Sequence, residues 1–494
     1  MRPTRSAADG NGASPPRRRR LRTRMSIACV AAAAVTAPML TACGSDYDAG
    51  VINMYAAADG FDFITEVAQR CTTDSNGEYS IKVNMLPKEA DMQRLQLARR
   101  LAGNDAGLDL MAMDVVWTAE FADAGWAVPV PDDIATRTRD TNLAGPLETV
   151  EWKRSDDAEK RLYAIPLWAN TQMLWYRPEL MNDKLDTTKA PTTWQGMLDD
   201  AAAIKDAGGP GAILLQAKQY EGLMVWFNSL LQSAGGQVLD PNDPTKVTLT
   251  DTPEHRKATI EALTVMRQVA TAPGADPSIS NSDEGTARTD MEAGKGAFEI
   301  NWPFVFAGIK ENGAAGDAKI TGDALTGFKD VIDATADDPT DPRVATVNDA
   351  TRKLFDFAAY PGITSGKTAK STPGGFNVAV ASTSKQQDLA FKAASCLTDE
   401  QAQKVYAVRG GTPPTIASLY DDADFQLAYP MYKIIRRQLD EGAAPRPATP
   451  RYQDMSTAIT ATLSPVGQWD PERKADELQK VAQGAIDGEG SSRD

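Results

Sequence analysis

Histidine is nearly absent from this chain, since its 494 residues include only His255. A Ser-His-Asp or Cys-His catalytic group would have to use this side chain, which lies in the polar stretch 251–255, typical of a helix start. A metal site with several histidine ligands is impossible. We therefore expect no hydrolase of these classes, no metal site, no cofactor and no enzyme activity.

Long apolar runs are missing as well. The run from Ile27 to Leu40 is shorter than the roughly 20 residues that span a membrane, and six arginines precede it between positions 17 and 24. This combination is typical of an exported protein whose N-terminal segment is removed. The pattern therefore predicts that the protein works outside the cytoplasm.

The end of this run resembles the cleavage site of a bacterial lipoprotein signal, with Leu-Thr-Ala-Cys at positions 40–43. We expect residues 1–42 to be a signal peptide, Cys43 to carry a lipid and residues 43–50 to be a polar tether. The body would then lie at the extracytoplasmic face of the cell membrane. An ordinary secretory signal with an incidental Cys43 is the alternative, and Met25 is a second possible start.

Cysteine is scarce too, with four in the whole chain. Cys29 would leave with the signal peptide and Cys43 would take the lipid, so Cys71 and Cys396 remain. An even pair in an oxidising compartment predicts a disulfide between them, with two buried free thiols as the alternative.

Basic residues are outnumbered, with 52 Lys and Arg against 67 Asp and Glu and a formal charge of −15. The expected signal peptide holds eight of the basic residues and one acidic residue. Residues 43–494 therefore carry 44 basic against 66 acidic side chains, a formal charge of −22. Such an acidic body argues against nucleic acid or an anionic ligand as a partner.

The start of the body alternates between strand and helix patterns. Residues 51–55, 79–85 and 108–114 read as strands, and the segments between them carry apolar residues at helical spacing. A β-α-β-α-β start predicts a parallel, doubly wound α/β sheet.

Two carboxylates follow strands of this predicted sheet, Asp59 after the first strand and Asp114 at the end of the third. Open α/β sheets bind ligands beyond the carboxyl ends of their strands. Trp117 comes three residues after Asp114, and a carboxylate beside an indole suits a sugar. The alternatives are core packing for Trp117 and a helix cap for Asp114.

The apolar, extended run from Leu162 to Tyr176 is too long for one strand. We expect it to leave one lobe and enter another near residues 166–168, which places Asn170 just beyond the crossing. Asn170 would then face the gap between the lobes.

Later segments add four candidate ligand residues. Glu284 opens a helix, Trp302 follows a strand, Gly375 lies in a glycine turn before a strand, and Arg446 lies in an extended segment before a C-terminal helix. Glu284 has the alternative of only favouring the helix dipole, and Arg446 that of a surface ion pair.

Together these motifs resemble the sugar-binding lipoproteins of ABC importers. The strings at 113–121, 170–172 and 301–306 are similar to those of the trehalose-recycling lipoproteins of actinobacteria. The resemblance implies a two-lobe, periplasmic-binding-protein-like α/β fold, each lobe a sheet flanked by helices, with a ligand cleft between the lobes. We expect residues 51–166 and about 376–420 in lobe 1, and residues 167–375 and about 421–494 in lobe 2.

The resemblance also implies ligand contacts from Asp114, Asn170, Glu284, Trp302 and Arg446, and more weakly from Asp59 and Gly375. It implies a monomer that captures trehalose or a related disaccharide and delivers it to a membrane permease with its ATPase. Another α-glucoside, a trehalose analogue or a polyol is the alternative ligand. A secreted glycoside hydrolase and a lipid-anchored scaffold without ligand are the alternative classes of protein.

Overall fold

The computed structural model describes residues 47–58, 60–87, 90–335, 340–363 and 368–489. These residues all belong to the unit Ser45–Asp494. The predicted ligand residue Asp59 and the predicted lipid-bearing Cys43 lie outside the described residues. The other predicted ligand residues lie within them.

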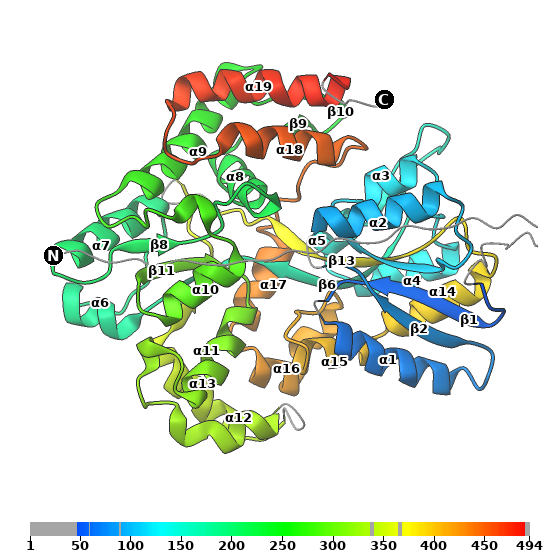
Figure 1. Cartoon of the computed structure of the whole chain (residues 1–494), viewed down its shortest axis with the longest axis horizontal. Helices are drawn as coiled ribbons and strands as arrows, with labels where there is room; N and C mark the ends of the chain where they lie inside the picture. Colours follow the sequence, from blue (N-terminus) through cyan, green and yellow to red (C-terminus); the bar gives the residue numbers. More distant parts are fainter. Residues whose placement is uncertain (1–46, 59, 88–89, 336–339, 364–367, 490–494) are drawn as a thin grey trace, which may run out of the picture. The chain divides into compact units, whose positions relative to one another are not determined.

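A five-stranded sheet in the order β2-β1-β3-β13-β6 organises the first lobe (Figure 1). Its strands are β1 (Val51–Ala56), β2 (Ser80–Met85), β3 (Leu110–Asp114), β6 (Ile165–Thr171) and β13 (Pro373–Val380). β1 pairs in parallel with β2 and β3, which confirms the β-α-β-α-β start predicted from the sequence. β13 is antiparallel to both of its neighbours, so a segment from late in the chain completes the sheet.

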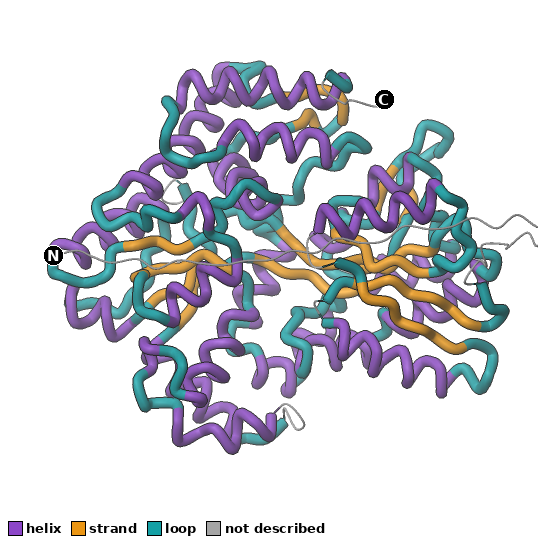
Figure 2. Tube along the Cα trace, in the orientation of Figure 1, coloured by secondary structure: helices purple, strands orange, loops and turns teal. Residues whose placement is uncertain are grey.

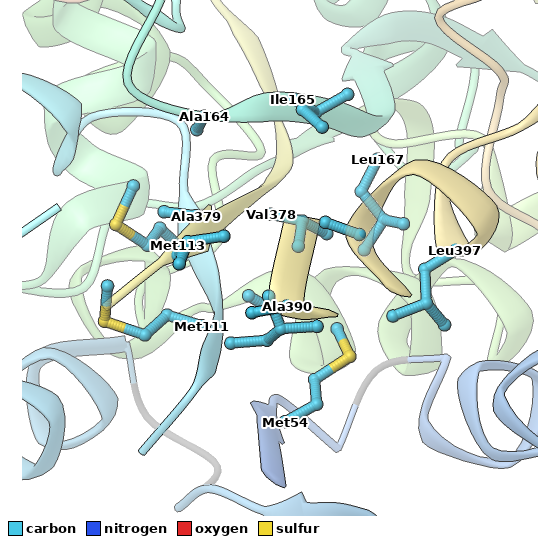
Figure 3. Close-up of a cluster of buried hydrophobic side chains, with 14 of the residues drawn as sticks. Met54, Met111, Met113, Ala164, Ile165, Leu167, Val378, Ala379, Ala390 and Leu397 are labelled. Carbon is cyan, nitrogen blue, oxygen red and sulfur yellow. The ribbon is translucent and has the colours of Figure 1, made fainter. Parts of the chain in front are cut away.

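Helices flank this sheet because their apolar faces and the strands bury each other (Figure 2). Met54 of β1, Met111 of β3 and Val378 of β13 meet Ala390 and Leu397 in the core of the lobe (Figure 3). The helices are α1 (Phe61–Asp74), α2 (Ala90–Ala102), α3 (Thr118–Asp123), α4 (Asp132–Thr141), α5 (Ala144–Glu148), α14 (Gln387–Leu397) and α15 (Glu400–Val408), and a small ribbon pairs β4 (Glu151–Trp152) with β5 (Arg161–Leu162).

The predicted disulfide is present. Cys71 lies on the buried face of α1 and Cys396 lies in α14, with Cα atoms 5.9 Å apart. The bond joins the first helix of the lobe to a helix 325 residues later in the sequence.

A four-stranded sheet in the order β12-β7-β11-β8 organises the second lobe. Its strands are β7 (Met173–Tyr176), β8 (Ala212–Leu214), β11 (Gly296–Asn301) and β12 (Asp356–Ala358). Phe298 and Ile300 of β11 pack on one face, in a core shared with α8 and α9. Trp175 of β7 packs in a different cluster with Phe306 and Phe355. The sheet is therefore buried on both faces.

The helices of this second part of the chain are α6 (Pro178–Leu185), α7 (Trp194–Asp206), α8 (Glu221–Ala234), α9 (Pro253–Thr271), α10 (Glu284–Glu292), α11 (Phe304–Ala315), α12 (Lys329–Thr335), α13 (Arg343–Leu354), α16 (Ala423–Ala428), α17 (Tyr432–Asp440), α18 (Tyr452–Leu463) and α19 (Pro471–Asp487). The shorter elements are β9 (Leu239–Asp240), β10 (Asp243–Val247) and the 3-10 turns η1 (Ile279–Asn281), η2 (Lys319–Thr321), η3 (Thr326–Phe328) and η4 (Ala417–Asp421). His255 lies in the first turn of α9, which confirms the helix start predicted for this stretch, and its ring nitrogen contacts Asp251.

The chain changes sheets at Gln172, later than the predicted crossing at residues 166–168. β6 stays paired with β13 as far as Thr171, and β7 enters the second sheet at Met173. Pro166 does not end β6 because its pairing with β13 falls at a register irregularity, where the missing N–H is tolerated. β13 likewise begins at Pro373, before the lobe boundary expected near residue 376.

Buried polar groups tie the segments that cross between the sheets. Gln438 of α17 donates to the Thr171 hydroxyl at 2.7 Å and to the carbonyl of Gln172 at 2.9 Å. The Ser371 hydroxyl donates to the same carbonyl at 3.2 Å. These bonds satisfy backbone groups that would otherwise be buried without partners, and they join three separate stretches of chain at one place.

Within the described residues, no helix has both the length and the apolar composition of a membrane span.

Candidate functional site

A buried ion pair joins the end of the first sheet to the segment before α18. Nη2 of Arg446 donates to Oδ1 of Asp114, the last residue of β3, at 3.2 Å. The Arg446 side chain is only 3% exposed, so it is not the surface ion pair that the sequence left open. Asp114 accepts a second bond from the Val116 amide, but Trp117 is the N-cap residue of α3 and has no side-chain cap bond. Asp114 therefore does not cap this helix.

Glu221, the first residue of α8, is a second carboxylate bound to the same guanidinium. It accepts from Nη1 of Arg446 at 2.7 Å, from the Ser456 hydroxyl at 2.6 Å and from the Tyr452 hydroxyl. Glu221 was not predicted from the sequence, because an acid in a first helical turn needs no further explanation. We call Asp114, Arg446 and Glu221 the charged triad.

The charges of the triad depend on one another. Burial alone would lower the pKa of Arg446, but the carboxylates of Asp114 and Glu221 raise it, so the guanidinium stays protonated. Burial raises the pKa of Glu221, and Arg446 opposes this effect. One cation is therefore shared by two carboxylates at the place where the two lobes meet.

A second group of side chains surrounds Glu284, the first residue of α10. Asp283 caps this helix by accepting from the amide of Thr286 at 2.9 Å. Burial raises the pKa of the Glu284 carboxyl, while the Tyr220 hydroxyl and the Trp302 side chain beside it act in the opposite direction. The structure thus brings Glu284 and Trp302 together, as the resemblance implied, and adds Tyr220.

Trp302 also reaches the first sheet. A Cβ atom built on Gly374 of β13 would lie 3.0 Å from Cη2 of Trp302, so the glycine leaves room for the ring. Gly374 pairs with Asn170 in the neighbouring strand β6. Asn170 is partly exposed, and it lies across the strand pair from the point where Trp302 packs. Trp302 and Asn170 therefore both lie next to Gly374 of β13.

Gly375 supports this arrangement through its backbone. Its φ angle of +127° is open to glycine and strained for other residues, and a Cβ there would collide with the Trp168 carbonyl of β6. The Gly375 carbonyl accepts from the amide of Val115, directly after Asp114. Gly375 thus holds the ends of β3 and β6 in place, and no side chain from this position faces a ligand.

Trp117 lies in the core of the first lobe, so the predicted ligand contact from this side chain is wrong. Its side chain is 2% exposed and its ring stacks on Phe121 with centroids 6.2 Å apart, inside the core of the first lobe. The apolar contact between β3 and α3 takes up the ring, so Trp117 has no face to offer a ligand. Core packing, the alternative reading, is the outcome.

A cavity of about 410 Å³ lies next to this region. Pro303 and Phe304, which follow Trp302, line it together with Phe63 of α1 and residues 408–411 at the end of α15 and just beyond it. None of the predicted ligand residues that the structure describes lines it. The cavity is thus a largely apolar neighbour of the polar site, and it separates helices of the first lobe from α11, α12 and α13.

The two lobes together offer carboxylates, an amide, a guanidinium and an indole. These groups belong to Asp114, Asn170, Glu221, Glu284, Trp302 and Arg446. Such a set suits an uncharged molecule rich in hydroxyl groups, because carboxylates accept from hydroxyls, guanidinium donates to them and an indole covers C–H surfaces. In the part of the chain that the structure covers, no group of three His, Cys, Asp or Glu side chains is arranged to hold a metal.

Two solved structures share this fold. Maltose-bound MalE3 of T. maritima aligns with a TM-score of 0.70 and 21% identity, over 88% of this chain and 99% of that one. The GacH receptor of Streptomyces glaucescens, solved unliganded and with acarbose, aligns with a TM-score of 0.69 and 19% identity, over 89% and 99% of the two chains. Both likenesses agree with the two-lobe α/β fold expected from the sequence.

A sequence relative from Deinococcus radiodurans, described as a probable ABC transporter-binding protein, is 25% identical over 401 residues, which are 78% of this chain and 81% of the relative. The model of the bacterial extracellular solute-binding protein family matches residues 76–404. The chain therefore belongs to the family of bacterial extracellular solute-binding proteins.

Proposed function

We propose that this protein is the ligand-capturing component of an ABC sugar importer and that its ligand is trehalose. The observation that carries the proposal is the bond between Asp114 of the first lobe and Arg446 of the second. Tyr220, which directly precedes Glu221 of the triad in the chain, lies beside Glu284 and so links the triad to the group around Glu284 and Trp302. Family membership, the description of the Deinococcus relative, and the maltose and acarbose bound by the two structural neighbours support a sugar importer.

Trehalose is the favoured sugar because of local sequence. The strings around Asp114, Asn170 and Trp302 resemble those of LpqY-type trehalose-binding lipoproteins. The non-reducing linkage of trehalose leaves both glucose units with a full set of ring hydroxyls to be paired, and a site built from two lobes can exclude other disaccharides by shape. Another α-glucoside, a trehalose analogue or a polyol remains the second candidate, since such ligands use the same donors and acceptors.

In the proposed mechanism, the ligand enters between open lobes and the lobes close over it. Asp114 and Glu284 accept hydrogen bonds from sugar hydroxyls, and Arg446 donates hydrogen bonds to them. Asn170 can donate and accept, and Glu221 holds the guanidinium of Arg446 in position. Trp302 covers an apolar face of one ring. Closure then presents both lobes to a membrane permease whose ATPase drives uptake.

The test is a panel of trehalose, maltose, glucose and mannitol, read by thermal shift and calorimetry. A ligand that binds only the folded state raises the melting temperature, so trehalose should give the largest shift. A larger shift with another sugar would replace trehalose but keep the class of protein. No shift with any sugar would contradict the proposal and favour a scaffold without ligand, and release of glucose from trehalose would favour a hydrolase.

We further propose that Cys43 carries a lipid that holds the monomer at the extracytoplasmic face of the cell membrane. The lipobox-like sequence at positions 40–43 supports this anchor. Mass spectrometry of the N-terminal peptide from membranes should find a lipid on Cys43, and Cys43→Ser should release the protein from the membrane fraction. An unmodified Cys43 in membrane-bound protein would refute the anchor.

A further inference from the structure

We propose that Glu299 is a positioning residue of the ligand site, which acts by fixing the side-chain amide of Asn301. This inference rests on the proposed sugar site, because its effect is exerted on Trp302 and on the helix that starts at Glu284. Glu299 lies inside β11 and is fully buried. Among the described residues its hydrogen-bond partner is Asn301, and no hydrogen bond or ion pair joins it to the charged triad.

Asn301 connects Glu299 to two ligand-contacting elements. Its Nδ2 donates to Oε1 of Glu299 at 2.6 Å and to the carbonyl of Glu284 at 3.0 Å. Its Oδ1 accepts from the amide of Trp302 at 2.9 Å. A single amide therefore sets both the start of α10 and the direction in which the chain leaves β11.

Glu299 helps to fix which way this amide points, together with the Glu284 carbonyl and the Trp302 amide. Its Oε1 atom is an acceptor, so the NH₂ end of Asn301 must face Glu299 and the oxygen must face Trp302. With an apolar residue at 299 the amide would lose this constraint, and the bonds to Glu284 and Trp302 would weaken together. The ligand site would then keep its residues but lose their alignment.

The surroundings of Glu299 favour its neutral form. Among the described residues, its second oxygen, Oε2, has no hydrogen-bond partner. The strands on either side place Trp175 and Leu214 opposite it. Such a site would leave a carboxylate charge without compensation.

The charged groups that face Glu299 come from α10. Burial raises the pKa of Glu299 to about 8, the bond from Asn301 and the cation of Arg288 lower it, and Glu292 raises it. α11 contributes Asn312, an uncharged residue that donates to Glu292. Deprotonation at higher pH would therefore place a poorly compensated negative charge inside β11, two residues before Asn301.

The experiment compares wild type, Glu299→Gln and Glu299→Ala in calorimetric titrations with the sugar that wild type binds, from pH 7 to pH 9. Gln is the closest neutral equivalent of a protonated Glu and keeps the acceptor for Asn301. Glu299→Gln should bind within about threefold of wild type at pH 7 and change little up to pH 9. The sugar affinity of wild type should fall about tenfold from pH 7 to pH 9. At pH 9, one unit above a pKa of about 8, only about one-tenth of the protein keeps the proton on Glu299.

Glu299→Ala should weaken binding at least tenfold at pH 7, and its melting curve shows whether it is folded. Glu261→Gln, which changes a carboxylate of α9, is the matched control and should keep the wild-type profile. Burial lowers the pKa of Lys310 to about 8 as well, but Lys310 is unchanged in all variants, so only the difference from Glu299→Gln is assigned to Glu299. Equal pH profiles for wild type and Glu299→Gln would overturn the proposal, and so would unchanged affinity in folded Glu299→Ala.

A ligand-free readout separates this proposal from the sugar assignment. Infrared difference spectra of wild type between pH 7 and pH 9 should lose the band of a protonated carboxyl, and Glu299→Gln should lack this change. If no sugar binds, the proposed function fails while this measurement still reports on Glu299. If sugars bind but the band is absent, the proposal for Glu299 fails alone.

Discussion

Replacing Arg446 by Met separates the structural and ligand-binding roles of the charged triad. The Arg446 side chain is 3% exposed and binds carboxylate oxygens at 2.7 Å and 3.2 Å. Met keeps most of the side-chain volume but removes the cation, so Glu221, whose side chain is 17% exposed, is left as a largely buried carboxylate without its counter-charge. Removing one partner of a buried pair typically costs about 3–5 kcal/mol of unfolding free energy, and we expect a loss of this order.

The loss should depend on pH in a defined direction. Burial already raises the pKa of Glu221, and removal of the cation raises it further above the unfolded value of about 4.3. A carboxyl whose folded pKa is raised binds more protons in the folded state, so stability falls as pH rises from the unfolded pKa toward the folded one. Denaturation curves of Arg446→Met should therefore lie closer to wild type at pH 5 than at pH 8.

The double variant Arg446→Met with Glu221→Gln completes the test. Gln removes the uncompensated charge and keeps acceptors for Ser456 and Tyr452, so most of the stability at pH 8 should return. Sugar affinity should stay at least tenfold below wild type, because the donor to the ligand is still missing, which corresponds to about 1.4 kcal/mol or more. If the double variant binds as well as wild type, Arg446 only maintains the fold and our reasoning about the ligand is wrong.

Four further variants test other parts of the proposed site and fold. Asn170→Ala and Trp302→Leu should each weaken sugar binding at least tenfold in calorimetry. Their melting temperatures should change little, because both side chains are partly exposed. Unchanged affinity for both variants would remove these residues from the site. Gly375→Ala should destabilise the first lobe by about 1–3 kcal/mol or more, since φ is +127° and a Cβ meets the Trp168 carbonyl, and a wild-type melting curve would disprove that strain. Replacing Cys71 and Cys396 by Ala should cost about 2–5 kcal/mol, measured against wild type with and without reductant; equal stability of oxidised and reduced wild type would contradict the expected contribution.

The parts of the fold that were predictable from sequence are those governed by local pattern. Alternation and helical spacing identified β1, α1, β2 and β3, and parallel pairing follows from their order. The point where the chain changes sheets was placed too early, at residues 166–168, because only the length of the apolar run suggested a crossing and β6 in fact stays paired as far as Thr171. Its partner strand lies more than 200 residues later, and only that pairing shows that a register irregularity accommodates Pro166.

The site was predictable where the residue type itself suggested the chemistry. Asp114 and Arg446 were both expected to contact ligand, but their bond spans 332 residues, and no local pattern reveals it. Glu221 was missed for the same reason, since its partners Arg446 and Tyr452 lie 225 and 231 residues away. Trp117 was wrongly predicted to contact ligand, because a position next to a strand end does not tell whether a ring turns outward or into the core.

The pairing of charges within the site bears on the kind of ligand it can take. Asp114 and Glu221 share one guanidinium, so the triad carries a net charge of about −1 before any ligand binds, and Glu284 is held with a raised pKa beside two neutral aromatic side chains. An anionic ligand would meet excess negative charge, and a cationic ligand would compete with Arg446 for its carboxylates. A neutral polyhydroxylated ligand instead exchanges water for hydroxyls without bringing a further ion into the site, so it carries no additional cost of burying an ion. Calorimetry with a glucosamine-containing disaccharide should therefore show weaker binding than with its uncharged counterpart, and equal or tighter binding of the cationic sugar would contradict this electrostatic reasoning.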